Sequence, residues 1–345
     1  MSDNPWEGAP LPPEPPSWEP SPATDAPRLA EHVDIAALLA GGLPEPPQPV
    51  LLRRQDGHAL FYAGMVNVVF GDPECGKTWI ALAACVEALQ SDRRATVVDV
   101  DHNGASEIVS RLLLLGAHPQ TLSDPSLFRL YEPDDADELR ATVTALRLWR
   151  PAVAIVDSLG EVIPMLGLSS NSPDDYSTAH RSVLTALADA GAAVIAVDHL
   201  PKSDDARVHG QTGTVAKRRA VNGTSLRVTL ATTFIPGHGG AANLVIHKDR
   251  HGGLRAHSPA DGKHPPAGRF VLSARDDGTA DWWVTNPDNA TEPLTSTTHE
   301  LHADIAELDS LEPEPTSVRD VKNRLGWGGT RATNALRAWK EHLAA

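Results

Sequence analysis

The stretch VVFGDPECGKTWIALAACVEALQ, residues 68–90, spaces two glycines, a lysine and a threonine as Gly-x-x-x-x-Gly-Lys-Thr. The two glycines let the backbone curl so that successive N–H groups face one cluster of phosphates. The lysine reaches β- and γ-phosphates, and the threonine hydroxyl suits a Mg²⁺ ligand. An apolar strand precedes the motif and a helix follows it, as a phosphate-binding loop requires. The predicted ATP-binding residues are Gly71, Asp72, Pro73, Glu74, Cys75, Gly76, Lys77, Thr78 and Trp79.

Composition limits the kind of protein. The chain has 345 residues, of which 41% are hydrophobic and 22% are charged. It can therefore bury one full-sized α/β core and a small satellite domain. No apolar run approaches bilayer length, so we expect a cytoplasmic protein with no membrane partner. Two cysteines, Cys75 and Cys85, exclude a disulfide scaffold. A net charge of −15 argues against a surface coated for nucleic acid but permits local basic patches.

The chain divides by composition. Residues 1–27 are rich in Pro, Glu, Ser and Asp and predict a disordered tail. Residues 28–285 form the expected ATPase domain, opening with a lead-in helix over 28–44 that Gly41 and Gly42 close. A polar linker over 286–315 then leads to a small basic helical module over 316–345.

Within the ATPase domain, short apolar strands alternate with helical segments. This pattern predicts an α/β fold with a mainly parallel sheet covered on both faces. Three later segments alternate differently and predict an antiparallel β extension. The predicted parallel strands are 65–70, 95–100, 126–131, 152–157 and 192–199, the helices 78–90, 105–116, 136–149 and 179–191, and the antiparallel strands 225–234, 242–249 and 268–274.

Two acids are candidates for the metal and for hydrolysis. Asp157 ends the strand AVAIVD, where it can complete a Mg²⁺ site with Thr78, although an acid there can also cap a helix, and Ser158 is a weaker candidate. Asp101, taken as the last residue of its strand and better placed than Asp99, can orient the attacking water or cap the next helix. We expect its strand to lie between the phosphate-loop strand and the Asp157 strand.

Basic and imidazole side chains follow two other strands. His199 ends the strand AVIAVDH at the sheet edge where ligands sit, so it can sense a γ-phosphate, although a lone histidine is often structural. Lys248 and Arg250, two residues apart, indicate either an exposed charged hairpin or an arginine finger supplied to a neighbouring subunit. The segment 217–219 is a competing cationic cluster.

Together these segments resemble the RecA-fold P-loop ATPases of the RepA type, an AAA-type group of hexameric replicative helicases of plasmids and phages, with RadA- and DnaB-like relatives. The resemblance spans about residues 34–253. Its carriers are the phosphate-loop region 50–89, DHNGASEIVSRLLLLGA, AIVDSLGEVIP, VIAVDHLPK and HKDRHGG, the last similar to the RadA branch's Lys-Asn-Arg-Phe-Gly element.

The resemblance implies a RecA-like core that hydrolyses ATP with Mg²⁺ at subunit interfaces of a hexameric ring acting on DNA. Its cationic element acts across the subunit boundary. The sequence departs from the family at Asp101, where a catalytic glutamate is usual, and at Asp198, where relatives often carry histidine, so only His199 is assigned as sensor.

The carboxyl-terminal module has a helix-turn-helix-like pattern with Trp327 and Trp339 as core anchors. It can bind DNA in a major groove, or cap the ATPase or mediate oligomerisation. The lead hypothesis is a RepA-like motor on single-stranded DNA, contacting it through loops at about 159–176 and 203–215. Alternatives are an ATP-dependent DNA-binding regulator or loader that assembles without unwinding, and, less well supported, a small-molecule kinase.

Overall fold

The computed structural model describes residues 33–200, 215–260, 262–275, 277–287, 307–311, 313–327, 332–333, 335–337 and 339–340. The predicted tail 1–27 and most of the loop 203–215 lie outside these ranges. The chain divides into two compact units, Met1–Glu45 and Pro46–Ala345. The first contains α1 (Ile35–Ala40), shorter than the predicted lead-in helix, whose N-terminus is capped by the Asp34 side chain accepting from the Ala37 N–H.

The second unit contains the predicted alternation of strands and helices, together with several short elements that the sequence did not predict. Its strands are β1 (Leu51–Arg53), β2 (Ala59–Phe61), β3 (Val66–Gly71), β4 (Ala95–Asp99), β5 (Phe128–Tyr131), β6 (Val153–Asp157), β7 (Ala193–His199), β8 (Thr224–Ile235), β9 (Gly239–Asp249), β10 (Pro266–Ala274) and β11 (Ala280–Val284). Its helices are α2 (Lys77–Leu89), α3 (Ala105–Leu114), α4 (Pro119–Ser123), α5 (Ala136–Trp149), α6 (Leu159–Met165), α7 (Pro173–Ala179), the π-helix η1 (His180–Thr185), α8 (Ala186–Asp189), α10 (Val215–Ala220), the 3₁₀ helix η2 (Arg255–His257) and α12 (Val318–Leu325).

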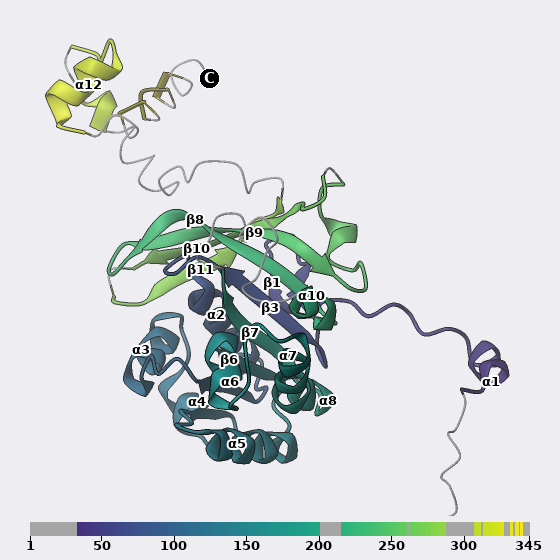
Figure 1. The fold of residues 1–345 in the computed structure, drawn as a ribbon. Coiled ribbons are helices and arrows are strands. Elements are labelled where there is room, and N and C mark those ends of the chain that lie inside the picture. The colour runs from purple at the N-terminus through teal and green to yellow at the C-terminus, as the bar shows by residue number, and fades with distance from the viewer. Residues whose placement is uncertain are drawn as a thin grey trace, which may run out of the picture. The chain divides into compact units, whose positions relative to one another are not determined.

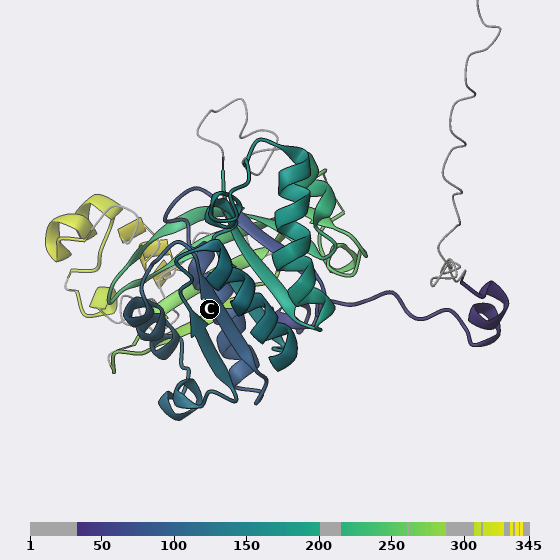
Figure 2. The ribbon, with the colours of Figure 1, turned by 60° about the horizontal axis from the view of Figure 1, so that its bottom comes forward.

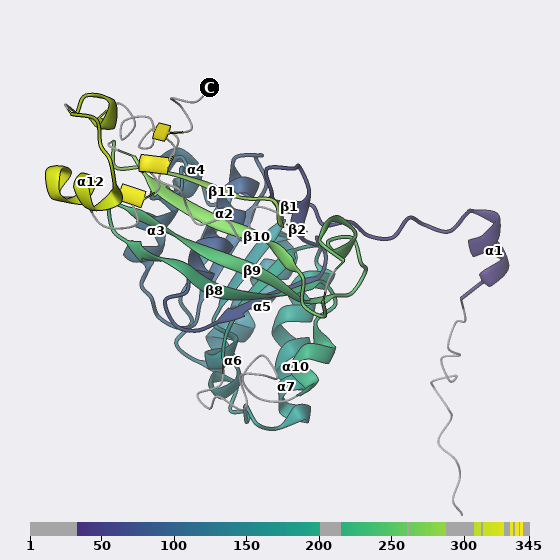
Figure 3. The same cartoon turned by 90° about the horizontal axis from the view of Figure 1, so that it is seen from above.

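Nine strands form one sheet in the order β11-β10-β9-β8-β3-β7-β6-β4-β5. The neighbours from β8 to β5 are parallel, and β8 to β11 pair antiparallel and lie side by side in Figure 3. This arrangement confirms the predicted RecA-like α/β fold with an antiparallel extension.

The predicted strand order is wrong at one position. β7, the strand that ends in His199, lies between β3 and β6, and β4 lies on the outer side of β6. The apolar runs identify parallel strands but do not specify their neighbours, because every buried strand of such a sheet has the same composition. The consequence is functional, since His199 rather than Asp101 emerges next to the phosphate loop.

Helices cover both faces of the parallel strands (Figures 1 and 2). Successive residues of β6, Ile155 and Val156, belong to opposite apolar cores. One core contains α2 and α3 and the hairpin β1–β2, and the other contains α5 to α8. The Glu87 carboxylate on α2 accepts the N–H groups of Leu52 and Arg53 at 2.9 and 2.8 Å, so the hairpin is fixed to the phosphate-loop helix.

The segment 159–176 is largely helical, which corrects the predicted DNA-contacting loop. α6 and α7 occupy most of it, and Leu159, Val162, Ile163 and Tyr176 are buried. α6 contains Gly160 and Pro164, both unfavourable in a helix, and burial against the sheet stabilises it. Only residues 166–172, between the two helices, remain as a connecting loop.

The carboxyl-terminal residues form a separate apolar cluster. α12 begins after Ser317, whose side chain accepts from the Asp320 N–H, and ends at Gly326 in the left-handed region. Seven residues pack together, including Leu308 from the segment predicted as linker: Leu308, Val321, Trp327, Ala332, Ala335, Leu336 and Trp339. Within the described ranges, no helix has the length and apolarity that a membrane span needs.

Asn67 on β3 connects the centre of the sheet to its neighbours. The side chain is fully buried, and its Oδ1 accepts the N–H groups of Tyr62 and Thr224 at 3.0 and 3.2 Å. Its Nδ2 donates to the carbonyls of Tyr62, Met65 and Val194, at 2.9, 3.2 and 3.2 Å. One amide therefore satisfies backbone groups from the hairpin, β7 and the start of β8.

We expect Asn67→Leu to lower the free energy of unfolding by about 3 kcal/mol or more, because two buried N–H groups lose their acceptor. Urea unfolding followed by circular dichroism measures this loss. Asn171→Ala, a substitution at an exposed loop position, is the control and should change stability by under about 0.5 kcal/mol. Equal stability of the two variants would contradict the role given to the Asn67 amide.

Candidate functional site

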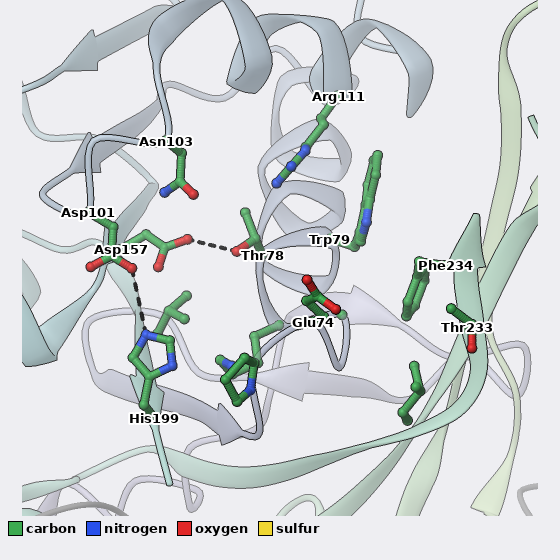
Figure 4. A pocket seen from close by; sticks show the side chains of 15 residues that line it. Glu74, Thr78, Trp79, Asp101, Asn103, Arg111, Asp157, His199, Thr233 and Phe234 are labelled. Carbon is green, nitrogen blue, oxygen red and sulfur yellow. Dashed lines mark hydrogen bonds and ion pairs between the residues drawn. The ribbon is translucent and has the colours of Figure 1, made fainter. Parts of the chain in front are cut away.

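The predicted phosphate loop lies between β3 and α2 and borders a cavity of about 490 Å³ (Figure 4). Lys77 is buried, and its Nζ donates to the carbonyls of Gly71 and Asp72 at 3.2 and 2.7 Å. The ammonium group is therefore held inside the curl of the loop, where phosphate oxygens can replace the carbonyls. Pro73, Glu74, Gly76, Lys77, Thr78 and Trp79 all line this cavity.

Strand β8 explains why both motif positions must be glycine. A Cβ at Gly71 would lie 2.3 Å from the Val228 carbonyl oxygen, and one at Gly76 would lie 2.5 Å from Cε2 of Phe234. Gly76 also has φ of +98°, a conformation unfavourable for other residues. Cys75, which directly precedes Gly76 in the loop, is a buried free thiol, and burial raises its pKa. The loop is thus shaped by contact with β8 as well as by its own sequence.

Asp157 and Thr78 meet as predicted for a metal site. The Thr78 hydroxyl donates to Asp157 Oδ2 at 2.8 Å, as the dashed line in Figure 4 shows. Burial raises the pKa of Asp157 to about 6, the Thr78 hydrogen bond opposes this, and the charges of Asp101 and Asp99 add to it. Ser158, rather than Asp157, is the residue that precedes α6 as its N-cap.

Asp101 contacts His199 at one side of the cavity (Figure 4). Asp101 Oδ2 is 3.6 Å from His199 Nε2, and its Oδ1 accepts from the Ser158 hydroxyl at 2.7 Å. The contacts with His199 and Ser158 hold the pKa of Asp101 below its ordinary value. Asp101 therefore faces the site instead of capping α3, and three strands supply the cluster.

Asp99, not Asp101, is the last residue of β4, which corrects the predicted strand end. The buried Asp99 carboxylate accepts from Asn103 Nδ2 at 2.8 Å and from the Gly104 N–H at 3.0 Å. It thereby fixes the turn into α3 and is committed to the fold. The two acids of the sequence DVD have separate tasks, because Asp99 ends β4 whereas Asp101 lies beyond it, where the chain no longer follows the strand.

Aromatic and arginine side chains border the cavity beyond the loop. Trp79 lies between Arg111, whose guanidinium carbon is 5.3 Å from the ring centroid, and Phe234, which stacks on it at 6.5 Å (Figure 4). The same three residues border an adjoining cavity of about 420 Å³. Flat π-faces and a guanidinium are suited to a nucleobase. Sequence reasoning gave no role to Arg111, although it lies in the segment DHNGASEIVSRLLLLGA, and missed Phe234, which belongs to no motif and comes from the distant β8.

The predicted finger residues lie away from this chain's own cavity. In the β8–β9 register, Lys248 lies opposite Ser225. The Arg250 N–H donates to the Gly223 carbonyl, and the Gly223 N–H donates to the Val66 carbonyl. Arg250 is therefore level with the start of β3, while the phosphate loop follows its end, about 16 Å farther along the strand. The two groups cannot meet within one chain in this arrangement.

Lys217 from the competing cationic cluster is paired. Its Nζ lies 2.9 Å from Asp198 Oδ2, and both side chains are almost completely buried. Asp198 also accepts the N–H of His199 at 2.9 Å. Asp198 is thus half of a buried ion pair that connects β7 to α10.

A family model described as an AAA domain matches residues 29–205, about half of the chain. The chain belongs to this AAA domain family. No curated protein matches it. The match supports a nucleotide-binding P-loop ATPase, and the AAA domain covers the phosphate loop, Asp101, Asp157 and His199.

The site of this AAA domain suits Mg²⁺ by its chemistry. Thr78 and Asp157 offer a hydroxyl and a carboxylate oxygen within hydrogen-bond distance of each other, and Mg²⁺ prefers such oxygens together with substrate phosphates. Among the described residues, no three His, Cys, Asp or Glu side chains gather into an all-protein cage. The cation would therefore depend on the nucleotide for its remaining ligands.

We expect acidification from pH 7.5 to 5 to stabilise the nucleotide-free protein by ~1.4 kcal/mol through Asp157. The folded-state pKa of about 6 lies above the ordinary aspartate value of 3.8, so the folded state binds the extra proton within this window. Urea unfolding at both pH values measures the effect, with Asp157→Asn as the reference that lacks this proton. An identical pH dependence in the two proteins would show that Asp157 does not titrate there.

Proposed function

We propose that this AAA domain ATPase is a ring-forming motor that moves on single-stranded DNA, similar to the RepA-type helicases, with ATP hydrolysed between subunits. One observation carries the proposal: the cationic pair lies at the opposite end of β3 from the phosphate loop. Of the residues that line the cavity, only Lys77 and Arg111 are lysine or arginine, and Arg111 pairs with Glu107 at 2.8 Å. A neighbouring subunit is the natural source of a further cation.

The described residues divide the work of hydrolysis. Lys77 and the loop N–H groups bind the phosphates, and Thr78 and Asp157 hold Mg²⁺, which when bound neutralises charge on the phosphates. Asp101 and His199 face each other where they can orient a water. Trp79 and Phe234 offer the surface for the base. These assignments use the geometry of a single chain.

The two finger candidates are not equivalent. Lys248 Nζ donates to the carbonyls of Arg219 and Val221, at 3.0 and 2.5 Å, so it holds the end of α10. Arg250 is exposed, and its guanidinium makes no hydrogen bond or ion pair within the described part of the chain. We assign the finger to Arg250 and a positioning role to Lys248.

DNA contact is proposed for the edge near α6 and α7 and for the basic module. The loop 166–172 connects these two helices, and most of the second predicted loop, 203–215, lies outside the described residues. α12 carries Arg319, Lys322 and Arg324. On a chain with net charge −15, such local basic groups would confine phosphate contacts to a few places.

A second candidate is an ATP-dependent DNA-binding regulator or loader that assembles without unwinding. The state of Asp101 favours it. Its carboxylate already accepts from Ser158 and contacts His199, and a lowered pKa makes it a weak proton acceptor. Slow turnover with stable assembly would follow from this arrangement.

We expect Arg250→Ala to bind ATP normally but to lose about 10³-fold in hydrolysis rate, as loss of an arginine finger does. Lys77→Ala should lose nucleotide binding and also be inactive. Mixing the two inactive variants should restore part of the activity, because one supplies the finger and the other the intact phosphate loop. A steady-state phosphate-release assay measures all three samples.

Arg147→Ala, at an exposed position of α5, is the control for loss of an arginine and should hydrolyse ATP normally. Normal hydrolysis by Arg250→Ala, or no recovery on mixing, would contradict the shared site.

We expect single-stranded DNA to stimulate hydrolysis several-fold and the protein to separate a forked duplex in the presence of ATP. Both follow if hydrolysis moves subunits relative to the strand. An ATPase assay with and without an oligonucleotide, and a fluorescent unwinding assay, measure the two effects. ATP-dependent assembly with negligible turnover and no unwinding would favour the regulator or loader instead.

A further inference from the structure

A second cavity has a volume of about 680 Å³, and none of its described lining residues borders the nucleotide cavity. α7, the π-helix η1 and α10 form its walls. Arg181 on η1 and Arg219 on α10 both line it, together with His180 and the hydroxyl residues Ser177 and Thr185. Its size is that of a small-molecule site, larger than a single simple ion requires.

The charge of this cavity is opposite to that of the chain. Among the described residues, its lining contains two arginines and no aspartate or glutamate, although the chain carries a net charge of −15. Neither Arg181 nor Arg219 forms a side-chain hydrogen bond or ion pair within the described ranges. Lys248 lies beside them, because its Nζ donates to the Arg219 carbonyl at 3.0 Å. The described part of the wall thus carries two arginines and no carboxylate, and Lys248 lies behind Arg219.

The protonation of His180 is affected by these positive charges. The pKa of this histidine is lowered to about 4, first by burial and then by the charges of Lys248 and Arg181. The imidazole is therefore neutral at physiological pH. Its Nδ1 is 3.1 Å from the Thr185 hydroxyl, and its buried Nε2 has no hydrogen-bond partner in the described structure. A buried polar atom without a partner is uncommon and indicates a missing ligand or water.

The local backbone gives independent support. His180 begins a π-helical stretch that ends at Thr185, between the α-helices α7 and α8. Such stretches are rare and are frequent at functional sites. Here the altered helical turn contains His180, Arg181 and Thr185, all of which line the same cavity.

We propose that this cavity binds a phosphate group, held by the guanidiniums of Arg181 and Arg219. Guanidinium groups bind phosphate through paired hydrogen bonds. Two guanidinium groups carry two positive charges, so a doubly charged phosphate is a better ligand for them than a singly charged carboxylate. The phosphate can belong to a DNA strand or to a free nucleotide or diphosphate. The site does not depend on the helicase proposal, because its evidence comes from this cavity and the residues next to it.

Inorganic pyrophosphate titrated calorimetrically into Lys77→Ala tests the site with the phosphate loop disabled. We expect Lys77→Ala to bind pyrophosphate, and a further Arg181→Ala or Arg219→Ala substitution to weaken binding about tenfold each. Adding Arg147→Ala should leave the affinity unchanged. The double Arg→Lys variant, which keeps the charge without the paired hydrogen bonds, should retain intermediate affinity.

Parallel titrations with a 15-residue oligothymidylate and with ATP distinguish the sources. Arginine-dependent binding of the oligonucleotide assigns the site to a DNA strand, and arginine-dependent binding of pyrophosphate and ATP alone assigns it to a free phosphate compound. Pyrophosphate affinity that survives loss of both arginines overturns the proposal. So does an absence of anion binding with a changed oligomeric state, which would give these arginines to a subunit contact.

Discussion

The buried carboxylate of Asp157 is the interaction on which the site depends. It lies at the end of β6, and its one hydrogen-bond donor among the described side chains is the Thr78 hydroxyl, at 2.8 Å. Removing a carboxylate from water costs several kcal/mol unless a partner compensates. Asp101 and Asp99 add negative charge nearby. The site therefore suits a cation. Without one, burial and the neighbouring acids raise the pKa of Asp157 to about 6.

The order of the strands determines what surrounds that carboxylate. Because β7 runs between β3 and β6, His199 emerges between the phosphate loop and Asp157, within reach of Asp101. The neighbouring Asp198 turns away into a buried ion pair with Lys217. Adjacent residues of one strand thus serve the site and the packing separately, as the alternation of a strand requires.

A continuous set of contacts connects the nucleotide site with the opposite end of the sheet. Asp198 binds Lys217 on α10, and the end of α10 is held by Lys248, two residues before Arg250. In each of these contacts, a lysine ammonium group donates to a carboxylate or to a backbone carbonyl. Arg181 and Arg219 add two further basic groups on the same flank of an otherwise acidic chain.

The amino-acid sequence by itself determined the phosphate loop, the parallel α/β fold and the antiparallel extension. These depend on local rules: the glycine spacing fixes a backbone curl, and the length and apolarity of each run fix its element type. The sequence also selected Asp157, Asp101 and His199, because polar residues at the carboxyl ends of parallel strands meet at one edge.

Tertiary structure alone decided which strands are neighbours, and so it overturned the expected place of β4. It brought Phe234 from β8 and Arg111 from α3 against Trp79, and it separated Arg250 from the phosphate loop of its own chain. It also made helices of most of residues 159–176. The physical reason is common to all four. Each depends on contacts between residues far apart in the chain, and burial stabilises them through surfaces that no local pattern specifies.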